Sequence, residues 1–294
     1  MRSLVLNFSE SEDLGKKLSS ILNLEHYLIE SKIFPDGEVY VRLPVNPENK
    51  RVIIIQRLYP EPNINFTKLL LTVDACRDLN AEEIIVILPY LAYSRQDRRF
   101  REGEAVSLKT ILKVLKHLGV KSIITVDVHK PQAYNLEGLN CINIEPFNEY
   151  ARYIKSNIGD CVILSPDYGS LWRVENTAKK LNVPYDYFEK IRDRITGEVT
   201  IKPKQINVQN KNVVIIDDII ATGGTIVKAI DVLRSLGVRN VHVIATHGLF
   251  IDNADVKIIK TGASSITCTN TILNKYSKID ITELIAEKLR QIIT

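Results

Sequence analysis

The stretch from Val213 to Thr225 constrains the fold of this chain more than any other, because it joins a buried strand to a helix through a glycine turn. Its first four residues are β-branched and apolar, which is typical of a strand covered on both faces of a parallel sheet. Asp217 and Asp218 follow, where open α/β sheets bind their ligands. A Thr-Gly-Gly-Thr turn then leads into residues 226–236, whose periodicity predicts a helix.

The turn has the composition of an anion cradle. Glycines let backbone N–H groups approach a ligand, and the positive end of the helix dipole lies behind them. Two acids beside such a cradle suit a ligand that carries both a phosphate and neighbouring hydroxyls, as a sugar phosphate does. The candidate residues for this ligand are Asp217, Asp218, Ala221, Thr222, Gly223, Gly224 and Thr225.

Composition excludes several other classes of function. The 294 residues are 45% hydrophobic and 25% charged, as in ordinary soluble globular proteins. The net charge of +4 is too small to argue for nucleic acid, although local basic clusters could hold anionic substrates. Four scattered cysteines without a CxxC pair indicate a reducing compartment. Since the chain starts as a strand rather than a signal peptide, and no apolar run reaches membrane-spanning length, we expect a cytoplasmic protein with neither nucleic acid nor membrane as partner.

The second half of the chain repeats the first. Residues 114–129 closely resemble residues 232–247, and residues 51–93 can be laid over residues 212–250. In the second overlay, Gln56-Arg-Leu-Tyr-Pro takes the place of the acidic phosphate turn. Strands alternate with helices throughout, which predicts parallel sheets. We therefore expect an α/β fold of two similar domains, each a mainly parallel sheet flanked by helices, at residues 1–143 and 144–294.

Two motifs in the first half suit a nucleotide. Phe34-Pro-Asp36-Gly-Glu38 reads as a turn, but its ring could stack on a purine while the carboxylates accept from the exocyclic amine. Residues 90–101 form an arginine-rich loop with interleaved aromatics after a predicted strand, and guanidinium groups suit polyphosphate. Single-stranded nucleic acid would also suit this loop, although acidic residues within it weaken that alternative.

Two further segments in the chain suit a metal ion and a charge-stabilising loop. His129 and Asp167 each follow a predicted strand and could hold a magnesium ion, which needs few protein ligands. Residues 188–198 carry Lys190 and Arg192 and predict a mobile loop or hairpin. Its cations suit the neutralisation of charge that develops in phosphoryl transfer, and a solvated hairpin is the plain alternative.

Together these segments, from the Phe-Pro-Asp-Gly-Glu turn to Thr269-Asn-Thr271, resemble ribose-phosphate pyrophosphokinases, which synthesise phosphoribosyl pyrophosphate (PRPP). The resemblance implies two type I phosphoribosyltransferase-like domains, a Mg²⁺ cofactor, the substrates ATP and ribose 5-phosphate, and a homo-oligomer, at least a dimer, with the adenine pocket shared between subunits. By that resemblance Lys190 and Arg192 belong to a catalytic loop, and Asp217, Asp218 and residues 221–225 hold ribose 5-phosphate. His129 and Asp167 position the metal. The implied ATP contacts are Phe34, Asp36, Glu38, Arg95, Gln96, Asp97, Arg98 and His129.

One departure and two alternatives accompany the resemblance. The family commonly has Asp where this chain has Ala221, which puts any contact of that acid in doubt but leaves the phosphate cradle. The alternatives are a phosphoribosyltransferase that consumes PRPP and a non-catalytic PRPP-sensing regulator. An ATP-binding half argues against the first, and the presence of His129, Asp167, Lys190 and Arg192 argues against the second.

Overall fold

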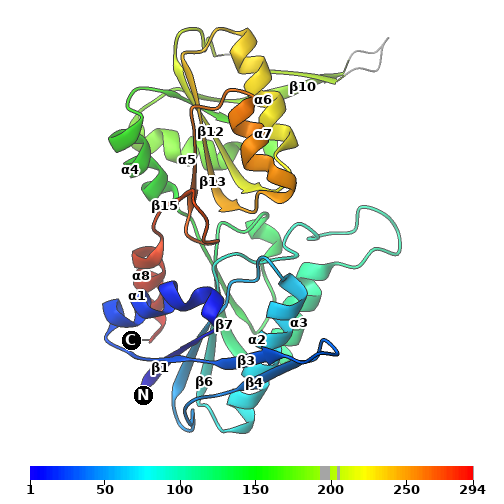
Figure 1. Cartoon of the computed structure of the whole chain (residues 1–294), viewed down its shortest axis with the longest axis vertical. Helices are drawn as coiled ribbons and strands as arrows, with labels where there is room; N and C mark the ends of the chain where they lie inside the picture. Colours follow the sequence, from blue (N-terminus) through cyan, green and yellow to red (C-terminus); the bar gives the residue numbers. More distant parts are fainter. Residues whose placement is uncertain (193–198, 204–205, 294) are drawn as a thin grey trace. The chain divides into compact units, whose positions relative to one another are not determined.

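The computed structural model describes residues 1–192, 199–203 and 206–293 and divides into two compact units, both drawn in Figure 1. The first unit contains residues 1–145 together with 282–294, and the second contains residues 146–281. The boundary lies two residues from the expected one. The C-terminal helix differs from the expectation, because it packs against the first helix of the first unit rather than joining the second domain.

The first unit is built on a six-stranded sheet with the strand order β2-β1-β5-β6-β7-β8, in which every pair is parallel. A separate antiparallel hairpin, β3–β4, packs on helix α2. The elements are β1 (Ser3–Asn7), α1 (Glu12–Leu22), β2 (Glu25–Leu28), β3 (Glu30–Ile33), β4 (Val39–Arg42), β5 (Arg51–Ile55), α2 (Pro62–Asp78), β6 (Glu83–Leu88), α3 (Ser107–His117), β7 (Val120–Val126), β8 (Asn140–Ile144) and α8 (Thr282–Ile293), with 3₁₀ turns η1 (Ser9–Ser11) and η2 (Pro131–Ala133).

The second unit has a seven-stranded sheet with the order β11-β10-β9-β12-β13-β14-β15, parallel except for the β10–β11 hairpin. Its elements are α4 (Phe147–Asn157), β9 (Val162–Ser165), α5 (Leu171–Leu181), β10 (Tyr185–Arg192), β11 (Val199–Pro203), β12 (Asn212–Ile220), α6 (Gly224–Ser235), β13 (Asn240–Gly248), α7 (Ala254–Lys260), β14 (Ser265–Thr269) and β15 (Ser277–Ile279), with 3₁₀ turns η3 (Tyr168–Ser170) and η4 (Ile251–Asn253).

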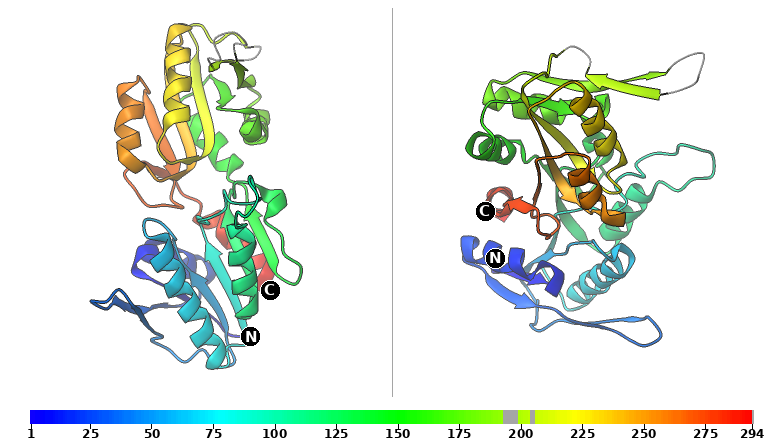
Figure 2. Two further views of the ribbon diagram at one scale, coloured as in Figure 1. Left: turned by 90° about the vertical axis from the view of Figure 1, so that its right-hand side faces the viewer. Right: turned by 45° about the horizontal axis from the view of Figure 1, so that its top comes forward.

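The central strands of both sheets are buried on both faces. Residues 52–55 and 213–216 have no solvent exposure, which explains why these strands read as continuous apolar runs rather than alternating ones. Helices cover the two faces of each sheet: α1 and α8 lie on one face of the first and α2 and α3 on the other, while α4 and α5 lie opposite α6 and α7 in the second (Figures 1 and 2). The predicted α/β class is thus confirmed.

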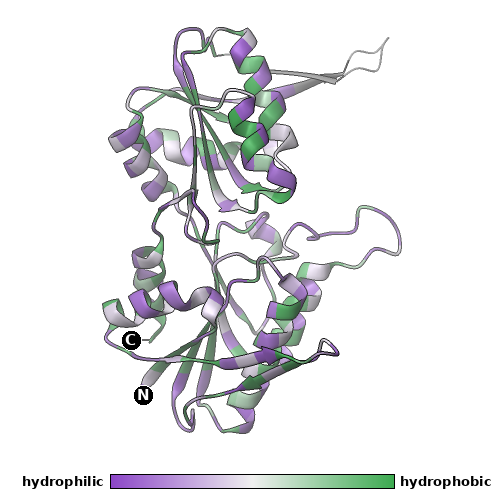
Figure 3. Ribbon diagram, in the orientation of Figure 1, coloured by the Kyte–Doolittle hydropathy of each residue, from purple (hydrophilic) through white to green (hydrophobic). Residues whose placement is uncertain are grey.

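Helices α1, α3, α4, α5 and α8 are amphipathic, with a buried apolar face and a solvent-exposed polar face. Hydrophobic and hydrophilic residues accordingly alternate along them in Figure 3. Helices α1 and α5 both end at an asparagine in the left-handed conformation, Asn23 and Asn182, which closes a helix before the next strand. Within the described ranges, no helix is both long and apolar enough to cross a membrane.

The two units share one strand order, which supports the internal repeat. Without β11, the second sheet reads β10-β9-β12-β13-β14-β15 and corresponds strand by strand to β2-β1-β5-β6-β7-β8. The broad overlay of residues 51–93 on 212–250 matches β5–α2–β6 to β12–α6–β13 and agrees with this order. The closer match of 114–129 to 232–247 pairs β7 with β13 and is therefore one strand out of register. That match reflects similar helix-to-strand corners rather than equivalent positions.

Candidate functional site

The candidate sugar-phosphate site lies at the switch point of the second sheet. The chain places β10 on one side of β9 and then β12 on the other, so the carboxyl ends of β9 and β12 flank the crevice where such sheets bind ligands. Asp167 follows β9, while Asp217 and Asp218 lie on β12. The sequence placed the two acids at the carboxyl end of the strand, and this was wrong by a few residues, because β12 continues to Ile220 along β13. On its other side, pairing with β9 stops at Ile215, which leaves an open edge.

The two adjacent acids have different surroundings. Asp218 continues the face of β12 that carries Val214 and Ile216 and packs against α4 and α5, and it is only 3% exposed. Its carboxylate forms an ion pair with Arg173 of α5, with an Nη2–Oδ2 distance of 3.6 Å, and its Oδ1 accepts from the backbone of Ile219. Arg173 is itself 1% exposed. Asp218 is therefore anchored on the helix side of the sheet.

Asp217 is more open to solvent than Asp218. Its Oδ1 accepts from the Ser170 hydroxyl at 3.2 Å and from the Asp218 backbone N–H at 3.0 Å. Ser170 in turn donates its backbone N–H to Asp167 Oδ1 at 3.1 Å, so one residue connects two of the predicted site acids. Burial and the neighbouring Asp218 carboxylate raise the pKa of Asp217 well above its ordinary value, and Arg173 only partly offsets this.

The predicted anion cradle adopts the expected strand–turn–helix form. Gly223 has φ +74° at the N-cap of α6, and the exposed hydroxyl residues Thr222 and Thr225 flank the glycines. Gly224 begins the helix, and a Cβ added there would meet no atom within 4 Å. Ala221, at the start of the turn, accepts at its carbonyl from the Ile251 N–H. The first turn of α6 thus has free space over a glycine backbone, as an incoming phosphate requires.

Lys190 and Arg192 lie on β10, beyond the point where this strand leaves the sheet. Pairing of β10 with β9 ends at Tyr187, and from Phe188 onward β10 pairs with β11. The hairpin reading of this segment is confirmed for the backbone, with Lys190 opposite Ile201 and Arg192 opposite Val199. The side chains of both cations, and the connecting residues 193–198 on which the mobile-loop prediction falls, lie outside the described residues.

In the first unit, the arginine loop and His129 lie at the same edge of the sheet. The loop follows β6, His129 follows β7, and these strands are parallel neighbours. Arg95 and Arg98 are exposed, while Gln96 and Asp97 are half-buried. Glu104 organises the loop: it accepts from the backbones of Phe100 and Arg101, and these bonds hold the pKa of its carboxyl below the ordinary value. Arg95 and Arg98 thus lie exposed in the loop that follows β6.

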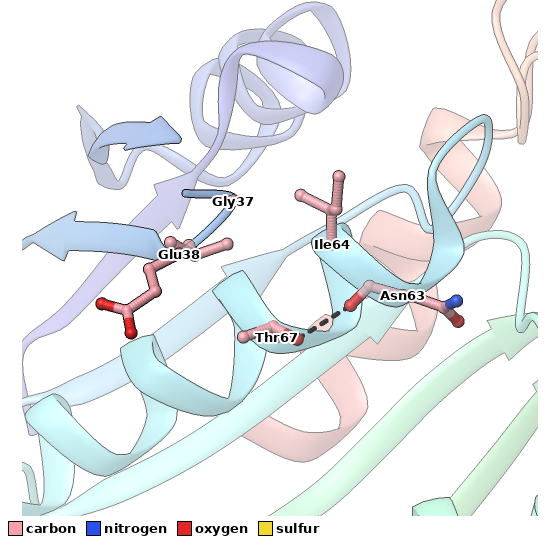
Figure 4. A pocket seen from close by; sticks show the side chains of 6 residues that line it. Gly37, Glu38, Asn63, Ile64 and Thr67 are labelled. Carbon is pink, nitrogen blue, oxygen red and sulfur yellow. Dashed lines mark hydrogen bonds between the residues drawn. The ribbon is translucent and has the colours of Figure 1, made fainter. Parts of the chain in front are cut away.

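The Phe34–Glu38 turn forms the tip of the β3–β4 hairpin. Phe34 is exposed, with Lys32 Nζ 4.7 Å from its ring centroid, and Asp36 accepts from the Glu38 N–H. Glu38 lines a hollow of about 390 Å³ together with Gly37, Val39, Asn63, Ile64 and Thr67. Figure 4 shows that this hollow lies between the hairpin and the first turns of α2. The Asn63 amide oxygen accepts from the hydroxyl of Tyr93, two residues before Arg95.

The first unit has no acidic phosphate turn at the place equivalent to the sugar-phosphate site. At the carboxyl end of β5, Gln56 and Arg57 occupy the positions of Asp217 and Asp218. The Arg57 side chain is 2% exposed and forms an ion pair with Asp13 of α1, while its backbone N–H donates to the Ser11 hydroxyl. A buried arginine thus fills this corner of the first unit.

The predicted metal ligands belong to different units, His129 to the first and Asp167 to the second. Among the residues that the structure describes, no group of three or more His, Cys, Asp or Glu side chains could hold a metal ion. A magnesium ion that keeps water and phosphate oxygens for most of its coordination does not need such a group. Asp167 uses Oδ1 to cap the turn before α5, and this bond leaves Oδ2 out of the cap.

Sequence reasoning missed Ser170 and Arg173, which hold the acid pair. A signal for Arg173 was available, because α5 buries Arg173, Val174, Thr177 and Ala178 on one face. An arginine among apolar residues on a helix face that covers a sheet requires a buried acid as partner. Asp218, on the same side of β12 as Val214 and Ile216, is that acid.

Comparison with known proteins agrees with this geometry. Residues 3–119 match the family described as the N-terminal domain of ribose phosphate pyrophosphokinase, and residues 147–276 match the phosphoribosyl transferase domain. The chain is 42% identical over 292 residues to a ribose-phosphate pyrophosphokinase of Saccharolobus solfataricus and 39% identical over 290 residues to one of Sulfurisphaera tokodaii, each match covering 97% of this chain and 100% of the relative.

A solved structure shows the same arrangement of elements. The crystal structure of phosphoribosylpyrophosphate synthetase from Mycobacterium smegmatis superposes with a TM-score of 0.89 at 26% identity, covering 99% of both chains. The similarity extends over both units and is not confined to either one. The chain therefore belongs to the ribose-phosphate pyrophosphokinase family.

Proposed function

We propose that this protein transfers the β,γ-pyrophosphoryl group of ATP to O1 of ribose 5-phosphate, which gives PRPP and AMP. The observation that carries the proposal is the site at the switch point of the second sheet. There an acid pair and an open glycine turn lie on one strand–turn–helix segment, as a ligand with adjacent hydroxyls and a phosphate requires. Full-length similarity to ribose-phosphate pyrophosphokinases supports the same reaction.

Ribose 5-phosphate binds along β12 and the start of α6 in this proposal. Residues 222–225 hold the phosphate through backbone N–H groups and the threonine hydroxyls, while Ala221 contributes its backbone to the turn. Asp217 accepts from the ribose hydroxyls, and Asp218 supports it from the buried side. Charge-assisted hydrogen bonds of this kind are roughly twice as strong as neutral ones, which suits a small polar substrate.

ATP binds through the first unit. The exposed guanidinium groups of Arg95 and Arg98 suit the triphosphate, with Gln96, Asp97 and His129 at the same edge. Phe34 stacks on adenine while Asp36 and Glu38 accept from its amine. Because Phe34 lies exposed at the tip of a hairpin, it can reach the site of another copy of this chain. We therefore propose a homo-oligomer, at least a dimer, that shares the adenine pocket between subunits.

The chemical step needs alignment and charge stabilisation more than it needs a general base. O1 attacks the β-phosphorus and releases its proton to solvent, the P–O bond to the α-phosphate breaks, and AMP leaves with that oxygen. Lys190 and Arg192 neutralise the charge that develops on the bridging and leaving oxygens. His129 and Asp167 are the residues that would hold Mg²⁺, which supplies further neutralisation of the polyphosphate when it is bound.

The cysteines suit the cytoplasmic location that we propose. Cys76, Cys161 and Cys268 are buried free thiols, and burial raises the pKa of each, to about 12, about 11 and about 12 respectively. Such thiols carry little thiolate at neutral pH, and free cysteines are typical of a reducing compartment.

The test is a direct assay of the products. Purified protein with ATP, ribose 5-phosphate and Mg²⁺ should release AMP and form PRPP in equal amounts, and neither product should form when ribose 5-phosphate is omitted. Asp217→Asn is the matched control, since it removes one charge from the ribose site without a change in size. A protein that consumed PRPP with a nucleobase and released pyrophosphate, but formed no AMP, would instead be a phosphoribosyltransferase.

A further inference from the structure

The first turn of α5 contacts both acids of the ribose site. Ser170, immediately before the helix, donates its hydroxyl to Asp217 Oδ1 at 3.2 Å, and Arg173, one turn later, pairs with Asp218 at 3.6 Å. Residues three apart lie on the same face of a helix. The two contacts therefore come from one short segment, the end of η3 and the first turn of α5, in which Ser170 is 7% exposed and Arg173 is 1% exposed.

These contacts divide the acid pair into two roles. Arg173 engages the buried carboxylate of Asp218. Ser170 and the Asp218 N–H bind the same oxygen of Asp217, Oδ1, so that Oδ2 takes part in neither bond. Two adjacent carboxylates repel each other, and a cation behind one of them lets both remain near the ligand. Asp218 is thus anchored by Arg173, whereas Asp217 is held through Oδ1 alone in the bonds to Ser170 and to the Asp218 backbone.

The first unit contains the same kind of ion pair with the charges exchanged. There Arg57 lies at the end of the central strand β5 and Asp13 lies in the first turn of α1, whereas in the second unit the acid is on the strand and Arg173 is on the helix. In each unit the pair joins the central strand, or the residues directly after it, to the helix that follows the neighbouring strand, β1 or β9. Either polarity therefore satisfies the fold, and the polarity of the second unit is the one that places carboxylates on the strand beside the phosphate turn.

We propose that Ser170 and Arg173 are positioning residues of the ribose site, which align Asp217 and anchor Asp218 for the hydroxyls of the sugar phosphate. This inference rests on the proposed function, because it assumes that the two acids bind ribose 5-phosphate. It goes beyond that function because it assigns the alignment of the two acids to residues at the start of α5. Neither residue touches the reacting atoms, so their loss should affect binding of the sugar phosphate before it affects the chemical step.

The experiment compares Ser170→Ala, Arg173→Lys and Arg173→Met in the full chain by steady-state kinetics and by calorimetric titration with ribose 5-phosphate. We expect Ser170→Ala to raise KM and Kd for ribose 5-phosphate roughly tenfold, as expected when one hydrogen bond to a charged group is lost. KM for ATP and the thermal midpoint should change little. Arg173→Met should raise KM for ribose 5-phosphate further, and Arg173→Lys should restore part of the affinity because it keeps a cation.

The first unit supplies matched controls. Arg57→Met breaks the charge-exchanged pair with Asp13, and Ser19→Ala removes a buried hydroxyl that binds only backbone carbonyls of α1. Arg57→Met should lower the thermal midpoint as Arg173→Met does, yet leave KM for ribose 5-phosphate unchanged. Ser19→Ala should change neither KM nor Kd for ribose 5-phosphate. Equal KM values for Arg173→Met and Arg57→Met, with only a smaller active fraction in each, would show that Arg173 is merely structural and would overturn the proposal.

Failure of the proposed function has a different signature. If the parent protein neither binds ribose 5-phosphate in the calorimeter nor releases AMP, the proposed function and this inference both fall. If the parent binds and turns over the sugar phosphate while Ser170→Ala and Arg173→Met keep its affinity, only the inference falls.

Discussion

The backbone of Gly223 lies against Ala254 of α7, so closely that a Cβ built on Gly223 would fall 3.2 Å from the Ala254 Cβ. Gly223 also has φ +74°, a backbone conformation that residues other than glycine rarely adopt. The next residue, Gly224, has neither constraint. The two glycines of the phosphate turn are therefore present for different reasons, the first for the fold and the second for the ligand.

We predict that alanine substitution separates these roles. Gly223→Ala should destabilise the protein by about 1–3 kcal/mol through strain and crowding. Gly224→Ala, in the first turn of α6, should leave stability unchanged or raise it by up to about 1 kcal/mol, because alanine has the higher helix propensity. The same methyl group should obstruct the phosphate and raise KM for ribose 5-phosphate at least about tenfold. Thermal unfolding and kinetics of both variants provide the check. A Gly224→Ala enzyme with parental affinity would place the phosphate elsewhere.

Asp217→Asn should make the protein more stable and inactive. In the folded protein, burial and the Asp218 carboxylate raise the pKa of Asp217 above its ordinary 3.8, so the folded state holds this proton more tightly than the unfolded state does. Stability is therefore lost as the pH rises from about 3.8 through the raised pKa. Asparagine has no such ionisation, and its oxygen can still accept from Ser170.

The difference between the two proteins should consequently grow with pH. We expect Asp217→Asn to match the parent near pH 4 and to exceed its free energy of unfolding by on the order of 1 kcal/mol at neutral pH. Denaturant titrations at several pH values measure this difference. A variant that is less stable than the parent at neutral pH would mean that Asp217 is held as an anion by favourable contacts.

Local sequence predicted the parts of this fold that depend on local physics. The apolar run before Asp217 is a buried strand, and the glycine turn begins a helix, because chain geometry and burial agree over those few residues. The end of β12 was misplaced, since β13 extends the strand to Ile220 and nothing in the acid pair itself reveals a partner strand. Contacts with distant segments, such as that of Arg173 with Asp218, could be inferred only once both were placed on facing surfaces.

The C-terminal helix also shows that local sequence does not reveal contacts with distant segments. Residues 282–293 read equally well as the last helix of either domain, because amphipathic periodicity does not identify the surface that a helix covers. In the structure α8 packs on α1 and buries Ile285, Ala286 and Leu289, and Arg51 of β5 donates to the carbonyl of Ile293. Chain order alone assigned this helix to the second domain, and packing assigns it to the first.

We predict that Leu289→Ala destabilises the first unit selectively. Loss of a fully buried leucine typically costs about 2–5 kcal/mol, and here the loss falls on the contact between α8 and α1. Hydrogen exchange should accelerate in residues 3–22 and remain unchanged in the strands of the second unit. Leu233→Ala, at an equally buried leucine of α6, is the control and should give the opposite pattern. Protection that fell in the second unit for Leu289→Ala would contradict the assignment of α8.

The shared adenine pocket predicts that a mixture of two impaired variants regains activity. Phe34→Ala should raise KM for ATP by removing the stacking ring, and Lys190→Ala should lower turnover roughly 100-fold or more by removing a cation from the transition state. If the hairpin of one subunit completes the site of another, a mixed dimer contains one site with an intact Lys190 and an intact Phe34. Random pairing of equal amounts then restores about a quarter of the parental activity.

The measurement needs subunit exchange, by co-expression or by joint refolding, followed by an AMP-release assay at an ATP concentration near the parental KM, where the Phe34→Ala defect is expressed. Lys190→Ala mixed with Asp217→Asn is the control, because both substitutions fall in the second unit and every mixed site carries one of them. That mixture should stay inactive. If the Phe34→Ala and Lys190→Ala mixture also stays inactive although light scattering shows that the subunits have exchanged, each chain completes its own adenine pocket, and the exposed ring at the hairpin tip serves its own subunit.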